Sequence, residues 1–207
     1  MLCGVGVSVL LAFAFTGAAV AQDDAGGFEI PEGLPDLKPP IVVTTCGQSP
    51  GALMVDVICD MIGLSCDQAD VLTAEELASG CSEDLCYGVL FVTTGTSLKG
   101  MGAAGVDIGY EIVRCTALIE AAKELGMVIV VGQIEGPSRR VDKYDEQSIQ
   151  AMSPLADLLI TRADVNEDGY FTDLAEEYGI PQIFIEDAID LEVLLPILFP
   201  PDLEADE

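Results

Sequence analysis

Few residues of this chain are basic, and half of them lie in loops that follow predicted β-strands. The chain has eight basic residues against thirty-six acidic ones, and four of the eight are Lys99, Arg139, Arg140 and Arg162 in such loops. In an open parallel α/β sheet, ligands bind in the crevice outside the carboxyl ends of the strands. Basic residues at that edge predict a site for a small anionic or polyoxygenated ligand.

The loop after the first predicted strand brings hydroxyl, amide and thiol groups to the start of a helix. It reads TTCGQS at residues 44–49. Unpaired N–H groups and the helix dipole favour an anion there, which makes Thr45, Gln48 and Ser49 candidate ligand contacts. The alternative is that Thr45 ends a strand and Ser49 caps the helix. Cys46 has no basic partner within several residues, so a catalytic thiol is disfavoured.

A second loop, TTGTSLKGMG at residues 93–102, combines small hydroxyl residues, three glycines and one lysine. Glycine lets backbone N–H groups approach a ligand closely, and lysine supplies charge. We take Thr94, Ser97, Lys99 and Gly100 as candidate ligand contacts, with a flexible loop as the alternative. The residue order is not that of a P-loop, and the glycines do not directly follow the strand as in a dinucleotide fingerprint.

Two further loops carry the arginines of this edge. Adjacent Arg139 and Arg140 point in different directions, so we expect one of them to clamp a carboxylate or phosphate bidentately. The alternative is a surface ion pair with a nearby carboxylate, such as Asp142 or Glu146. Arg162 follows the next predicted strand and belongs to the same edge.

Calcium is the cofactor that one motif suggests. Asp164, Asn166 and Asp168, followed by glycine, match the first six positions of an EF-hand or dockerin-type loop. The closing position is Ala175, with Glu176 one residue late, so the bidentate ligand is missing. An Asx-rich turn before a helix explains the same residues. The chain has no histidine and no Cys-x-x-Cys, which disfavours zinc and thioredoxin-like redox chemistry.

Apolar strand-like runs alternate with helical patterns along the chain. The predicted strands are 41–45, 71–72, 87–93, 127–131, 158–161 and 183–185. The predicted helices are 49–63, 73–80, 107–126, 172–178 and 188–198. This alternation predicts an α/β three-layer sandwich with a mostly parallel, Rossmann or flavodoxin-like sheet of about five or six strands.

The ends of the chain differ from this central region. Residues 1–21 are uncharged and apolar and end in Ala19-Val20-Ala21, which predicts a cleaved signal peptide and export to the periplasm or the exterior. An uncleaved membrane anchor is the alternative. Residues 22–40 are an acidic, Pro/Gly-rich linker or arm, 41–199 form one domain, and 200–207 are an acidic tail.

The net charge limits the classes of binding partner, and the cysteine content indicates the cellular compartment. The net charge of -28 repels nucleic acid and anionic lipid, and no membrane insertion is expected after signal cleavage. The sequence does not define an oligomeric state. Six cysteines remain after cleavage, and structural disulfides are favoured, with Cys59 near Cys66 and Cys81 near Cys86 in sequence. These local pairs leave Cys46 and Cys115.

Four stretches, TTCGQSPGALMVDVI, GTSLKGMGAAGVDIGYEI, GPSRR and NEDGYFTDLAEEYGIP, resemble an uncharacterised family of secreted bacterial α/β domains, a domain of unknown function. The resemblance covers about residues 40–199 and brings no known activity. It implies that the family pattern includes Gln48-Ser49, Ser97, Lys99-Gly100, Gly105, Arg139-Arg140 and Asn166-x-Asp168-Gly169. In that family the position of Cys46 is commonly a small residue, which weakens a catalytic thiol. The acidity and cysteine content of this chain depart from more lysine-rich members.

Three functions therefore compete. The first is an exported binding domain for a small anionic or polyoxygenated ligand, without turnover. The second is a hydrolase or transferase that uses the same edge, with Lys99 or an arginine as the electrophilic group and Asp164 or Glu135 as base. The third is a surface interaction protein that calcium stiffens at residues 164–168.

Overall fold

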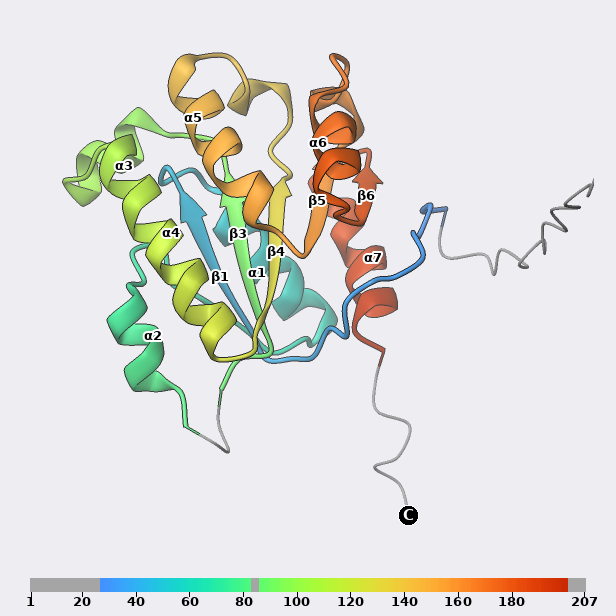
Figure 1. The fold of residues 1–207 in the computed structure, drawn as a ribbon, viewed down its shortest axis with the longest axis horizontal. Helices are drawn as coiled ribbons and strands as arrows, with labels where there is room; N and C mark the ends of the chain where they lie inside the picture. The colour runs from blue at the N-terminus through green and yellow to red at the C-terminus, as the bar shows by residue number, and fades with distance from the viewer. Residues whose placement is uncertain (1–26, 83–85, 201–207) are drawn as a thin grey trace, which may run out of the picture.

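The fold is built on one open sheet whose six strands all run parallel. We analysed a computed structural model that describes residues 27–82 and 86–200. The strand order is β2-β1-β3-β4-β5-β6. The strands are β1 (Ile41–Cys46), β2 (Cys66–Gln68), β3 (Val89–Thr94), β4 (Val128–Gln133), β5 (Leu158–Arg162) and β6 (Gln182–Ile185). The predicted α/β class and parallel sheet are confirmed (Figure 1).

Helices cover both faces of the sheet, which gives three layers. They are α1 (Gly51–Ile62), α2 (Ala74–Gly80), α3 (Leu98–Ala104), α4 (Ile108–Glu124), α5 (Lys143–Met152), α6 (Tyr170–Tyr178) and α7 (Leu191–Leu198). One core cluster packs α1 and α7 on one face, and a second packs α2, α4, α5 and α6 on the other (Figure 1). Strand β1 serves both clusters, because Ile41 and Val43 face α1 while Val42 and Cys46 face α4.

Strands β2 and β3 lie on opposite sides of β1, so the order in which the chain adds strands to the sheet reverses between β1 and β3. Strand β2 pairs with one side of β1, and β3 pairs with the other side in the register Ile41↔Val89 to Cys46↔Thr94. The loops that leave β1 and β3 therefore diverge at a topological switch point, where open α/β sheets bind their ligands. The strand arrowheads in Figure 1 point toward this carboxyl edge.

Three elements differ from the sequence-based expectation. The second strand is Cys66–Gln68, not 71–72, because this edge strand is polar and half-exposed and gives no apolar run. Helix α3 was expected as a glycine-rich loop, and α5 was not predicted at all. The capping box of α2 is confirmed, since Thr73 and Glu76 exchange both of its hydrogen bonds.

The arm before β1 packs on the domain instead of standing free. Phe28, Ile30 and Leu34 lie against the α1/α7 cluster, and Leu37 is buried within it. The predicted signal peptide and the tail from residue 201 onward lie outside the described residues. Within the described part of the chain, no helix has the length and apolar character needed to cross a membrane.

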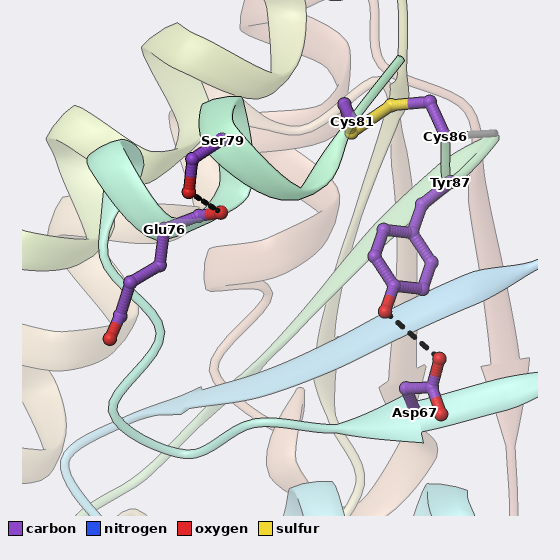
Figure 2. Close-up of a disulfide and its surroundings, with 6 residues drawn as sticks. All are labelled: Asp67, Glu76, Ser79, Cys81, Cys86 and Tyr87. Atoms are coloured by element: carbon purple, nitrogen blue, oxygen red, sulfur yellow. Dashed lines mark hydrogen bonds between the residues drawn. A yellow bond between two sulfur atoms is a disulfide. The ribbon is translucent and has the colours of Figure 1, made fainter. Parts of the chain in front are cut away.

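The cysteine prediction is confirmed for one of its two pairs. Cys81 and Cys86 form a disulfide at the end of α2 (Figure 2). Cys59 and Cys66 are free cysteines in the structure. Beside the disulfide, the hydroxyl of Tyr87 donates to Asp67 at 2.9 Å and ties the end of this loop to β2 (Figure 2).

Candidate functional site at the switch point

The loops that follow β1 and β3 are joined across the switch point. Ser97 N donates to Gly47 O at 2.8 Å, and Gln48 forms an isolated antiparallel bridge with Thr96. Gln48 has a φ of 56°, a left-handed conformation that non-glycine residues adopt rarely. Such backbone strain persists where surrounding contacts enforce it, and it clusters at binding sites.

Close backbone approach explains the glycine at position 100. A Cβ atom there would lie 2.1 Å from the carbonyl oxygen of Gln48, whereas a Cβ at Gly102 in the same helix meets nothing within 4 Å. Gly100 is therefore required by the contact between α3 and the β1 loop.

These two glycines give a matched pair of variants. We expect Gly100→Ala to lower the free energy of unfolding by about 1–3 kcal/mol, because the β1 loop must move away. Gly102→Ala should instead raise it by about 0.5–1 kcal/mol through better helix propensity. Urea unfolding measures both, and equal effects of the two substitutions would contradict the close approach.

A buried ion pair lies beneath the β1 loop. Glu111 of α4 is fully buried, and its Oε2 accepts hydrogen bonds from Gly47 N at 3.1 Å and Gln48 Nε2 at 2.9 Å. Arg114, one turn further along α4, donates to both carboxylate oxygens of Glu111 at 3.0 and 2.9 Å. The carboxylate thus fixes both the backbone and the side chain of the strained segment.

Arg114 extends this network to the strands. Its guanidinium also donates to Thr45 O at 2.6 Å, Leu72 O at 2.9 Å and Thr44 Oγ1 at 3.3 Å. Burial is the largest influence on the pKa of Arg114 and lowers it, but the hydrogen bonds to Glu111 and the nearby negative charge together outweigh burial and hold that pKa above its usual range. The N–H groups of Arg114 that face β1 therefore all have an acceptor.

A second buried carboxylate holds the β3 loop. Asp145 of α5 accepts from Thr96 N at 2.8 Å, Thr96 Oγ1 at 2.6 Å and Val141 N at 3.1 Å. Ser148, one turn later, donates to Cys46 O and accepts from Gly95 N. Side chains of α4 and α5 thus hold the two switch-point loops in place.

The start of α1 is occupied by a carboxylate of the protein itself. Glu135, in the loop after β4, accepts from Gly51 N at 2.9 Å through Oε1 and from Arg139 Nε at 3.1 Å through Oε2. Arg139 also donates to Thr96 O at 2.9 Å. The predicted helix cap by Ser49 is wrong, because Pro50 is the N-cap and Glu135 satisfies the first helical N–H.

The other two arginines of the edge are held by acidic partners. Arg140 pairs with Glu146 at 3.0 Å and Asp168 at 2.8 Å, donates to Val165 O, and stacks near the rings of Tyr170 and Phe171. The ion-pair alternative that the sequence left open for Arg140 is thus what the structure shows.

Arg162 is paired in the same way. It contacts Asp164 at 2.6 Å and Asp187 at 3.1 Å. A Cβ on Gly136 would lie 2.8 Å from its guanidinium carbon, so the β4 and β5 loops meet here. Each of the three arginines at this edge is therefore paired with at least one carboxylate.

The residues of the calcium-like motif each have a different partner. Asp164 accepts from Arg162, Asp168 accepts from Arg140 and Tyr170 N, and Asn166 accepts from Phe171 N at 2.8 Å. Hydrogen bonding to Arg140 lowers the pKa of Asp168. No cluster of three His, Cys, Asp or Glu side chains suited to a metal was found among the described residues. The calcium expectation stays a prediction.

The predicted contacts fall into two groups along the carboxyl edge. The first group lies around the switch point, where Gln48 pairs with Thr96 and Arg139 donates to Thr96 O. It comprises Thr45, Gln48, Ser49, Thr94, Ser97, Lys99, Gly100 and Arg139. Arg140 and Arg162 lie with the calcium-like residues beside β5. Thr45, Ser49 and Thr94 are buried, while Gln48, Ser97 and Arg139 are partly exposed and Lys99 is exposed.

Sequence reasoning missed the two buried acids that support the site. Glu111 lies on the apolar face predicted for α4, between Ile108 and Cys115 at helical spacing, and Arg114 follows within the same turn. Charged residues inside an apolar stripe are the signal that could have found this pair. Asp145 gave no such signal, because its helix was not predicted.

The chain belongs to the family described as domain of unknown function (DUF6305), whose profile matches residues 38–199. This confirms the resemblance to an uncharacterised α/β family, while export stays a prediction. No curated protein matches the sequence.

Some solved structures are distantly similar. The esterase EstA from Pseudoalteromonas sp. is 12% identical, with 70% of this chain and 76% of that chain covered and a TM-score of 0.31. A GDSL-like lipase from Bacteroides thetaiotaomicron is 12% identical, with 71% and 67% covered and a TM-score of 0.33. The SGNH-hydrolase family esterase AlinE4 is 13% identical, with 81% and 85% covered and a TM-score of 0.32. Likeness at this level assigns no activity to this chain.

Proposed function

We propose that this chain binds a small, oxygen-rich ligand with an anionic group at the switch point between β1 and β3, without turning it over. The observation that carries the proposal is the position of Glu135. Its carboxylate accepts from the first N–H of α1 and from Arg139, and the same two donors would be offered to the anionic group of a ligand. A ligand carboxylate or phosphate would replace Glu135 at these donors.

The surrounding contacts support a rigid binding site. Buried Glu111 and Asp145 hold the two loops, so the backbone near Gln48 does not need to reorganise when a ligand arrives. Lys99 and Arg139 supply partly or fully exposed cationic groups from the β3 and β4 loops. A fixed site with few exposed charges suits selective binding of a small ligand.

The geometry does not favour the hydrolase or transferase alternative. Both oxygens of Asp164 accept hydrogen bonds from Arg162, and both oxygens of Glu135 are also occupied. A general base must reach the proton that it removes, and these carboxylates face donors instead. Cys46, the last residue of β1, is buried in the core cluster that contains α4.

Thermal unfolding in the presence of small anions tests the proposal. Dicarboxylates, phosphate and sulfate should raise the Tm, because a ligand that binds only the folded state stabilises it. At one hundred times the Kd the gain is about 2.7 kcal/mol, or about 5–10 °C for a domain of this size. Glu135→Gln should enlarge the shift, since the competing carboxylate is gone, and Arg139→Ala should abolish it.

Lys123→Ala is the matched control, because Lys123 pairs with Asp157 and belongs to neither switch-point loop. This variant should keep the full shift. The proposal fails if no anion moves the Tm of either the native chain or Glu135→Gln. Stabilisation by calcium that a chelator and Asp164→Ala both remove would favour the surface interaction protein instead.

A further inference from the structure

Four cysteines outside the observed disulfide are free in the structure and fall into two pairs. Cys59 and Cys66 belong to the α1/α7 core cluster, and Cys46 and Cys115 belong to the cluster on the opposite face of the sheet. Cys46, Cys59 and Cys115 are fully buried, and Cys66 is partly exposed. Each core cluster therefore contains one pair of free cysteines.

The sheet separates the two pairs. Cys59 ends the buried face of α1, and Cys66 opens β2 and packs on the same α1/α7 cluster. Cys46 and Cys115 lie in the cluster on the opposite face, where Cys115 Sγ is also 3.7 Å from Thr45 O. Any exchange of partners between the pairs would have to pass through the strands, so the fold allows only one pairing of these four.

We infer that the chain folds with three disulfides, Cys46–Cys115, Cys59–Cys66 and Cys81–Cys86, when oxidant is present. The third is already formed in the structure. The sequence left the pairing open, and spacing alone gave no reason to join Cys46 to Cys115. The arrangement of the layers supplies that reason.

Each new bridge forms by thiol–disulfide exchange with a disulfide oxidant such as oxidised glutathione. One cysteine thiolate attacks a sulfur of oxidised glutathione, forms a mixed disulfide and releases one glutathione thiolate. The partner cysteine thiolate then attacks the cysteine sulfur of the mixed disulfide and releases the second glutathione thiolate. The protein gains one S–S bond and loses two protons and two electrons, while the oxidant becomes two thiols. Cys46, Cys59 and Cys115 are fully buried, so a disulfide oxidant reaches them only before the fold is complete and the bridges form during folding.

The Cys46–Cys115 bridge would also reach the ligand site, a consequence that rests on the proposed function. Cys46 precedes the strained segment of the β1 loop, and Cys115 follows Arg114 on α4. The bridge would fix covalently the two elements that Glu111 joins by hydrogen bonds.

Peptide mapping tests the pairing without reference to ligand binding. The full chain is refolded with reduced and oxidised glutathione, denatured, alkylated without reduction and digested. We expect linked peptides for Cys46 with Cys115 and for Cys59 with Cys66. Alkylated Cys46 and Cys115, or a link from either to another cysteine, would overturn the inference.

Unfolding temperatures supply a second measurement. A bridge that closes a long loop restricts the unfolded chain most, so reduction should lower the Tm by about 10 °C or more. Cys46→Ala, Cys115→Ala and the double variant should lose equal amounts, because each removes the same bridge. Additive losses would show two independently packed thiols and would contradict the bridge.

Discussion

Replacing Glu111 by alanine is expected to lower the free energy of unfolding by about 3–5 kcal/mol. Arg114 would keep its buried charge without a carboxylate, and Gly47 N and the Gln48 amide would lose their acceptor. The free energy of unfolding of a native domain is only about 5–15 kcal/mol in total, so the variant should be close to unfolding. Urea unfolding followed by circular dichroism measures the loss.

Lys123→Ala is again the control, because it also breaks one ion pair of α4. That pair is 3.9 Å long and exposed at both ends, so its loss should cost about 0–1 kcal/mol. A Glu111→Ala variant as stable as Lys123→Ala would mean that water reaches Arg114, and the network would then not hold the β1 loop.

The strands could be predicted where the chain signals burial on both faces. β1, β3 and β4 are runs of β-branched and apolar residues, which strands inside a parallel sheet require. β2 reads Cys-Asp-Gln, because an edge strand buries little, and α3 carries glycines that lower helix propensity. Local patterns therefore predicted the centre of the sheet and missed the edge strand β2 and the helices α3 and α5.

The proximity of the candidate residues could be predicted, but the acidic partners of the arginines could not. Loops after parallel strands share one edge, and this placed Gln48, Ser97 and Arg139 together. The acidic partners come from distant segments, as Asp168 does for Arg140, and the chain offers thirty-six acids for eight bases. Which acid meets which arginine depends on tertiary contacts that no local motif encodes.

The charge balance also bears on ligand choice. A free anion must compete with carboxylates that already sit beside Arg139, Arg140 and Arg162. The intramolecular partner is always present at high local concentration, so only a ligand with several contacts can replace it. An oxygen-rich ligand that also bonds Gln48 or Ser97 meets this requirement better than a simple ion.

Asp145→Ala is the second substitution with a large expected effect. The buried amide and hydroxyl of Thr96 and the amide of Val141 would lose their acceptor. Each unsatisfied buried donor costs about 1–3 kcal/mol, and we expect a total loss of about 3 kcal/mol after local relaxation. The β3 loop should also lose its fixed position beside Gln48, so the Tm shift by anions should shrink with it.

Asp142→Ala provides the comparison on the same helix. Asp142 caps α5 through Tyr144 N and Asp145 N from an exposed position, and loss of such a cap costs about 1 kcal/mol. It should leave the anion-induced shift unchanged, because it does not touch the β3 loop. If both variants lose equal stability and both keep the shift, then α5 supports the domain in general and Asp145 does not position the site.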